Sequence, residues 1–279
     1  MQELAMENVL IDVETLAAWM AEGRDVVVLD ARARLDDADA GRALWQHGHV
    51  PGALHADMDR ELSAPPTREG GRHPLPDTAT FTAQLRRWGV TPEVPVVIYD
   101  DQGGALAGAR AWWMLIWAGH PSVHVLDGGW PAWRDSDQMV ATDMPRPTPS
   151  AWTPRFNDDL IATAEDVERG DAVLLDARAG ERFRGEHEPI DPAAGHIPGA
   201  RNVPAASMLD TGSHFLSPDA LSQALPAGDN MISYCGSGIS ACQLILASAV
   251  AGRPLPRLYP GSWSAWSSDP ARPVATGAA

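Results

Sequence analysis

A cysteine stands among very small residues, between a short β-like run and an apolar helical run. Residues 230–251 read NMISYCGSGISACQLILASAVA. This pattern predicts a strand over 230–234, a tight loop, and a helix over 239–251 that ends at Gly252. Backbone N–H groups converge in such a loop, and the helix N-terminus adds partial positive charge. Cys235 should therefore be a nucleophilic thiolate; the alternative is a small core cysteine, the usual fate of a free thiol.

The charge of the chain limits its partners. The formal net charge is −16, which argues against nucleic acid or an anionic membrane as a partner. The sequence contains no lysine, so a Schiff-base mechanism and the Walker A phosphate loop are excluded. An anionic substrate must be held by arginine, histidine or backbone N–H groups.

Length and cysteine content indicate a reduced globular protein. The 279 residues are enough for two domains, and 44% of them are hydrophobic. We expect no membrane span and see no secretory signal in the acidic N-terminal stretch. Two cysteines make no disulfide framework, so a cytoplasmic setting is expected. The cysteines and the scattered histidines show no metal-ligand spacing, and no cofactor is expected.

The chain carries one sequence pattern twice, with four motifs in the same order. The pairs are VVLDAR at 27–32 with VLLDAR at 173–178, GHVPGA at 48–53 with GHIPGA at 195–200, VVIYD at 96–100 with MISYC at 231–235, and GWPAW at 129–133 with SWSAW at 262–266. Each copy alternates β-like and helical runs, which predicts an α/β fold with a parallel sheet covered by helices on both faces. The lead-in helix should be shorter in the second copy.

A proline-rich stretch separates the two copies. We place the first domain at 1–137, a linker at 138–158 and the second domain at 159–279. Proline cannot continue a helix or a central strand, so the linker should be extended. Its Trp152 should pack against the body of the protein.

The two copies differ at the residue that could do chemistry. The first copy has Asp100 where the second has Cys235. A carboxylate can sit in a ring of N–H donors but cannot accept or donate sulfur. The second copy should therefore be active and the first a scaffold.

These motifs resemble the two-domain rhodanese family, the thiosulfate and 3-mercaptopyruvate sulfurtransferases. The loop CGSGIS at 235–240 is similar to the active loop of the mercaptopyruvate branch, usually CGSGVT. The resemblance implies two tandem rhodanese-like domains, an inactive first domain with Asp100 at the nucleophile position, and a Cys235 persulfide. It also implies a small anionic sulfur donor and a thiol, cyanide or small redox protein as acceptor. Around the sulfur it implies a substrate-binding loop formed by Gly236, Gly238, Ile239 and Ser240.

The resemblance further implies residues that bind the donor and move a proton. Arg182, in the ERFRG motif, matches the family arginine that holds the donor's anionic group; Arg184 is the alternative. A relay of Ser237, His73 and Asp59 is implied in the mercaptopyruvate branch and could move a proton as the C–S bond breaks. In the alternative interpretation Ser237 is a turn residue, His73 a loop histidine, and Asp57 the acidic partner.

At two positions this chain differs from the family motifs, and both differences bear on the identity of the sulfur donor. The mercaptopyruvate enzymes carry a second arginine shortly before the second GHIPG motif, where this chain has Ile190. The thiosulfate branch has a basic residue inside the active loop, where this chain has glycine and serine. We favour 3-mercaptopyruvate as donor, with thiosulfate as the alternative.

Two other classes of function fit the sequence less well. A cysteine phosphatase of related fold needs arginine six positions after the cysteine, and that position is Ala241. A persulfide carrier without donor chemistry would not need Arg182 or the relay. Cys242, within the predicted helix, is expected to be a core side chain.

Overall fold

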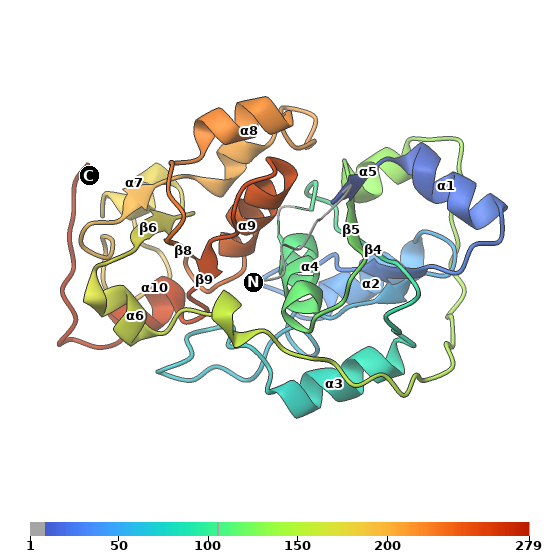
Figure 1. Ribbon diagram of the computed structural model, residues 1–279, viewed down its shortest axis with the longest axis horizontal. Helices are drawn as coiled ribbons and strands as arrows, with labels where there is room; N and C mark the ends of the chain where they lie inside the picture. Colours follow the sequence, from blue (N-terminus) through green and yellow to red (C-terminus); the bar gives the residue numbers. More distant parts are fainter. Residues whose placement is uncertain (1–8, 105, 279) are drawn as a thin grey trace. The chain divides into compact units, whose positions relative to one another are not determined.

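The computed structural model describes residues 9–104 and 106–278, which form two compact units (Figure 1). The first unit contains the described residues up to 62, with 76–157 and 211–215; the second contains 63–75, 158–210 and the residues from 216 onward. The segment 63–75 thus lies in the first sequence repeat but belongs to the second unit. Within the described residues, no helix is both long enough and apolar enough to span a membrane.

The first unit is built on a five-stranded sheet in which all paired strands are parallel. In spatial order its strands are β1 (Leu10–Ile11), β5 (Val123–Leu126), β4 (Val96–Tyr99), β2 (Val27–Asp30) and β3 (Leu54–His55). Its helices are α1 (Val13–Ala21), α2 (Ala40–His47), α3 (Thr78–Arg87), α4 (Ala107–Trp117) and α5 (Gly129–Arg134). Side chains of α1 and α5 join the core on one face of β4, and α4 packs against β4 and β5. Every residue of β4 and β5 is buried, as expected for a parallel sheet covered on both faces.

The second unit repeats this plan with a smaller sheet. Its parallel strands are β7 (Arg201–Asn202), β6 (Val173–Asp176), β8 (Met231–Tyr234) and β9 (Arg257–Leu258), in that order. Its helices are α6 (Ala164–Arg169), α7 (Gly180–Phe183), α8 (Pro218–Ala224), α9 (Ala241–Val250) and α10 (Ser262–Ser267), with 3₁₀ turns η1 (Asp158–Leu160) and η2 (Ala205–Met208). A parallel bridge from Ile161 to Leu258 extends the sheet beyond β9. The predicted α/β fold with two parallel-sheet domains is confirmed.

The elements around the cysteine match the sequence prediction closely. Strand β8 and helix α9 lie within the predicted ranges, and α9 begins two residues later than predicted. The delay has a local cause, because the first bonds are of the 3₁₀ type: Cys242 N–H donates to the Ile239 carbonyl at 3.0 Å and Gln243 N–H to the Ser240 carbonyl at 3.2 Å. Gly252, with φ of 65°, follows the end of α9 as expected. Helix α6 has 6 residues against 9 in α1, so the shorter lead-in helix is confirmed.

The proline-rich stretch up to residue 157 is largely extended and packs within the first unit. The Trp152 ring meets His120 edge-on, with ring centroids 5.4 Å apart. Arg86 Nε donates to the Trp152 carbonyl at 2.8 Å, and Ser150 N–H donates to the Arg86 carbonyl at 2.9 Å. The predicted packing of Trp152 against the body is confirmed.

A buried ion pair links the repeated motifs in the second unit. Arg178 Nη2 donates to Asp176 at 2.6 Å and to the carbonyl of Gly195 at 2.7 Å. The hydroxyl of Tyr234 bonds Asp176 and accepts the Ile197 N–H at 3.2 Å. The Asp-Ala-Arg motif therefore holds the Gly-His-Ile-Pro turn and the end of β8 together.

The first unit contains the same arrangement. Arg32 Nη2 donates to Asp30 and to the Gly48 carbonyl, and Tyr99 donates its hydroxyl proton to Asp30 at 2.7 Å. The tryptophan motif takes part in both units, since Arg32 lies 4.4 Å from the Trp130 ring centroid and Arg178 lies 4.6 Å from that of Trp263. All four repeated motifs meet at one ion pair per unit.

The buried pair in the second unit predicts a large loss of stability when it is broken. Arg178→Ala leaves the fully buried Asp176 carboxylate without its cation, which should cost about 3–5 kcal/mol of unfolding free energy. Urea denaturation followed by tryptophan fluorescence measures this loss. Arg184→Ala, which breaks an exposed pair with Glu186, is the control and should leave the unfolding free energy nearly unchanged. Equal losses in the two variants would contradict the structural role of the pair.

Candidate active site

Cys235 follows directly on a strand whose end is fixed. Burial raises the pKa of Tyr234 well above its ordinary value, so its hydroxyl stays neutral and bonds the Asp176 carboxylate. The backbone of Cys235 is held from the other side by α10: its N–H donates to Ser262 Oγ at 3.1 Å, and its carbonyl accepts the Trp263 N–H at 2.9 Å. The position of the cysteine is thus set by β8 and α10 together.

The sulfur of Cys235 lies inside the loop. Gly238 N–H donates to Sγ at 3.1 Å, and the cysteine is 2% exposed. Helix α9 begins at Ala241, directly after this loop, so its N-terminal partial charge acts on the same region. An amide donor and a helix N-terminus both favour a negatively charged sulfur.

The other loop residues have different surroundings. The Gly236 carbonyl accepts the Ser264 N–H at 2.9 Å, which fastens the loop to α10. The Ile239 side chain is buried, and its carbonyl accepts the Cys242 N–H at 3.0 Å. Ser240 occupies the N-cap position of α9 without a capping hydrogen bond from its side chain. Substrate binding by Gly236, Gly238 and Ser240 stays a prediction, whereas the side chain of Ile239, also predicted to bind substrate, is part of the buried core.

Two of the predicted relay residues meet in the second unit. His73 Nδ1 lies 2.8 Å from Ser237 Oγ, although the two residues are 164 positions apart. The segment 63–75, which carries His73, is bound to α10: Arg72 N–H donates to Ser264 Oγ at 3.2 Å. Gly71 permits this close approach, because it has φ of 78° and an added methyl group would lie 2.4 Å from Ser264 Oγ.

The two candidate acidic partners lie in the first unit. Asp57 accepts the N–H groups of Asp59 and Arg60 at 3.1 Å, and its other oxygen accepts a bond from the Arg60 side chain at 2.9 Å. Burial, and then the charge of Asp57, raises the pKa of Asp59. The participation of Asp59, or of Asp57, in the relay stays a prediction.

Two arginines converge on the active loop. A methyl group on Gly236 would lie 3.0 Å from Arg72 Nη2 and 3.4 Å from Arg182 Nη1. Arg182 was predicted from its motif, whereas Arg72 was missed. Its signals in the sequence were its place beside His73 and the absence of lysine, which makes every arginine a candidate anion ligand.

Two buried carboxylates hold the arginine pair. Glu188 accepts bonds from Arg182 Nη2 at 2.7 Å and Nε at 3.2 Å. Asp191 accepts a bond from Arg182 Nη2 at 3.1 Å and forms an ion pair with Arg72 Nη1. Burial raises the pKa of Asp191 against the lowering effect of Arg72, whereas the pKa of Glu188 is lowered because the hydrogen bonds from Arg182 and the backbone outweigh its burial.

The remaining sequence candidates lie elsewhere in the second unit. Ile190 is 58% exposed. Cys242 is fully buried in α9 and its Sγ donates to the Gly238 carbonyl at 3.4 Å, so it supports the loop from beneath. Both cysteines are free thiols. Within the described ranges, no three His, Cys, Asp or Glu side chains are grouped to hold a metal ion.

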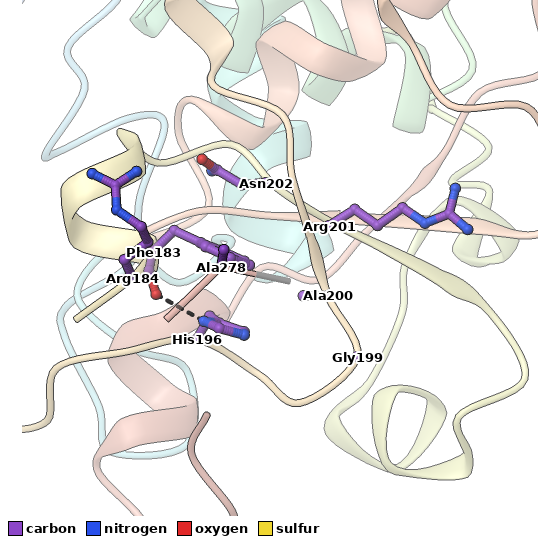
Figure 2. Close-up of a pocket in the computed structure, with 8 residues that line it drawn as sticks. All are labelled: Phe183, Arg184, His196, Gly199, Ala200, Arg201, Asn202 and Ala278. Carbon is purple, nitrogen blue, oxygen red and sulfur yellow. Dashed lines mark hydrogen bonds between the residues drawn. The ribbon is translucent and has the colours of Figure 1, made fainter. Parts of the chain in front are cut away.

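A separate pocket of about 690 Å³ lies on the second unit (Figure 2). Its lining residues are Phe183, Arg184, His196, Gly199, Ala200, Arg201, Asn202 and Ala278. His196 is held in it by a 2.8 Å bond from Nδ1 to the Phe183 carbonyl. Arg184 lines this pocket while Arg182 reaches Gly236, so the two neighbouring arginines serve different surfaces.

The loop of the first unit shows what such a turn can bind. The Asp100 carboxylate accepts four backbone N–H bonds at 2.8–3.0 Å, from Gln102, Gly104, Leu106 and Gly108. Burial raises the pKa of this carboxyl, and the four N–H donors act in the opposite direction. The loop after the central strand is therefore an anion cradle, which the first unit fills permanently with its own side chain.

Comparison with known proteins agrees with this architecture. The model of the rhodanese-like domain matches residues 12–136 and 162–269. The chain is 45% identical over 281 residues to a Pseudomonas aeruginosa protein named "Probable 3-mercaptopyruvate sulfurtransferase", covering 96% of this chain and 98% of that protein. It is 45% identical over 286 residues to a Mycobacterium tuberculosis protein named "Putative thiosulfate sulfurtransferase SseB", covering 99% of each. A solved 3-mercaptopyruvate sulfurtransferase from Leishmania major superposes with a TM-score of 0.82 at 31% identity, over 92% of this chain and 73% of that one.

The chain belongs to the rhodanese family and carries its domain twice. With full-length relatives named as 3-mercaptopyruvate or thiosulfate sulfurtransferases, it is a sulfurtransferase. The resemblance drawn from the sequence is confirmed at the level of family, fold and class of enzyme.

Proposed function

We propose that the protein transfers sulfur from 3-mercaptopyruvate, through a persulfide on Cys235, to a thiol, cyanide or a small redox protein. The proposal rests on one juxtaposition. Cys235 Sγ accepts an amide N–H inside the loop, and two guanidinium groups face Gly236, the next residue. A nucleophilic sulfur beside an anion-binding fork suits a donor with sulfur at one end and a carboxylate at the other.

In the first half-reaction the Cys235 thiolate attacks the sulfur of the donor. A new S–S bond forms and the C–S bond breaks, and its electron pair leaves with carbon as the enolate of pyruvate. The thiol proton of the donor moves to that carbon, so the products are pyruvate and an anionic Cys235 persulfide. The Ser237–His73 pair can carry this proton, since the two side chains are hydrogen-bonded.

In the second half-reaction an acceptor thiolate or cyanide attacks the outer sulfur and restores the Cys235 thiolate. The Gly238 amide and the start of α9 favour negative sulfur both before and after transfer. The four amides around Asp100 support the ability of this kind of loop to stabilise an anion. Because the nucleophile must be reduced and both cysteines are free, we assign the protein to the reducing cytoplasm.

The donor assignment follows from the charges beside the loop. Arg72 and Arg182 bring two cations, but Glu188 and Asp191 are bonded to them. A planar carboxylate can pair with guanidinium N–H groups without needing a large excess of positive charge. The thiosulfate dianion needs a larger excess of positive charge. Since the 45% identical relatives carry both donor names, thiosulfate is the second candidate.

The nucleophile can be tested by Cys235→Ser. This variant should lose sulfur transfer and keep its fold, because one atom in a loop changes. Mass spectrometry of the unmodified protein after donor treatment should show one added sulfur on Cys235. Cys242→Ser is the matched control and should keep turnover. Sulfur found on Cys242, or an active Cys235→Ser protein, would refute the assignment.

The donor-binding arginine can be tested by Arg182→Ala. Loss of a charge-assisted hydrogen bond costs about 1.5–3 kcal/mol, which corresponds to a reduction of kcat/KM by roughly tenfold to a few hundredfold. Arg184→Ala, two residues away and exposed, should keep kcat/KM nearly unchanged. The reverse pattern would show that the wrong arginine had been assigned.

The donor preference is tested by kcat/KM for the two donors in the unmodified protein. We expect 3-mercaptopyruvate to be the better donor and thiosulfate to be used slowly. Parallel assays with cyanide as the common acceptor give the ratio directly. A ratio in favour of thiosulfate would overturn the donor assignment while leaving the persulfide mechanism intact.

A further inference from the structure

Four charged side chains form a closed group beside the active loop, called here the clamp: Arg72, Arg182, Glu188 and Asp191. Glu188 bonds Arg182, and Asp191 bridges Arg182 and Arg72. Both carboxylates are buried, with side-chain exposures of 3%, whereas the two arginines are 30% and 19% exposed. The carboxylates thus lie behind the arginines, which are open to solvent.

One edge of each guanidinium group remains available at the loop. Asp191 binds Arg72 through Nη1 and Arg182 through Nη2. The opposite atoms, Arg72 Nη2 and Arg182 Nη1, are the ones that approach Gly236. Among the described residues, neither Arg72 Nη2 nor Arg182 Nη1 donates a hydrogen bond. Asp191 therefore orients both arginines so that their available N–H groups converge where a donor must bind.

The clamp has no net formal charge when its four members are ionised. Arg178, which also reaches Glu188 at 3.4 Å, is balanced by Asp176. A donor thus meets directional N–H groups without a surplus of positive charge. Such a site suits a monoanionic carboxylate better than a dianion, whose larger charge a neutral clamp does not offset.

We propose that Asp191 determines donor specificity, by setting the clamp to zero net charge and so favouring a monoanionic carboxylate over the thiosulfate dianion. The proposal rests on the sulfurtransferase mechanism proposed above and assigns its donor selectivity to one buried carboxylate. It also gives Arg72 a role in donor binding, beside Arg182 at Gly236.

The test is Asp191→Asn, assayed with 3-mercaptopyruvate and with thiosulfate at about pH 8, far above the ordinary carboxyl pKa. The variant retains an oxygen acceptor for one arginine and gives the clamp a charge of +1. The ratio of kcat/KM for thiosulfate to that for 3-mercaptopyruvate should rise by about fivefold to tenfold, through the KM for thiosulfate. Added salt should reduce this rise, because the gain is electrostatic.

Glu186→Gln is the matched control. It removes one negative charge five residues earlier, from an exposed carboxylate paired with Arg184, and should leave the donor ratio unchanged. Arg72→Gln should lower the ratio, since it removes a cation from the clamp. In a Cys235→Ser background, calorimetric titration with thiosulfate should show tighter binding when Asp191→Asn is added, independently of turnover.

The results of these experiments distinguish failure of the proposed function from failure of the specificity proposal. If the unmodified protein takes sulfur from neither donor, the proposed function fails. If it turns over and Asp191→Asn lowers kcat/KM equally for both donors, or Glu186→Gln shifts the ratio as much, Asp191 is structural and the specificity proposal alone is overturned. Unchanged thiosulfate affinity in the Cys235→Ser background would overturn it as well.

Discussion

Each unit is organised around one ion pair buried at the end of its central strands. Asp176 and Arg178 are 0% and 2% exposed, and Arg178 also bonds the Gly195 carbonyl and lies over Trp263. A buried pair of charges is costly unless every remaining hydrogen-bonding atom is satisfied. This requirement fixes the turn, the tryptophan helix and Tyr234 relative to one another. Cys235 is the next residue after that tyrosine, so the nucleophile that we propose takes its position from the ion pair.

The two units share this scaffold and differ in the residue at the centre of the loop. The first unit keeps the ion pair, the tyrosine and the loop, and fills the loop with the carboxylate of Asp100. In the second unit the corresponding residue is a cysteine, whose sulfur, in our proposal, is loaded and unloaded. The first unit directs four amide N–H groups at a permanent anion, and the second directs the Gly238 N–H at the cysteine sulfur. The two loops thus share backbone N–H donors and differ in one side chain.

The positive charge beside the active loop comes from arginines that are paired with carboxylates. With a net charge of −16 and no lysine, every strong cation is an arginine, and the two beside the loop are held by Glu188 and Asp191. Fixed guanidinium groups lose little freedom on binding and offer planar, directional donors. Their buried counterions limit the local field. In our proposal the site thus recognises the shape of an anionic group without attracting every anion.

The sequence by itself determined the duplicated α/β fold, the strand–loop–helix around Cys235, the pairing of Asp100 with Cys235 in the repeat, and the family. These features are local: each rests on adjacent residues or on a motif repeated along the chain. Only the tertiary structure placed segment 63–75 in the second unit and brought Arg72 to the active loop, whereas the family resemblance had already implied the pairing of His73 with Ser237. The contacts that hold this segment, from Arg72 to Ser264 and from His73 to Ser237, join residues more than 160 positions apart. No periodicity or spacing encodes such a contact, because it depends on how Gly71 lets two distant backbones approach.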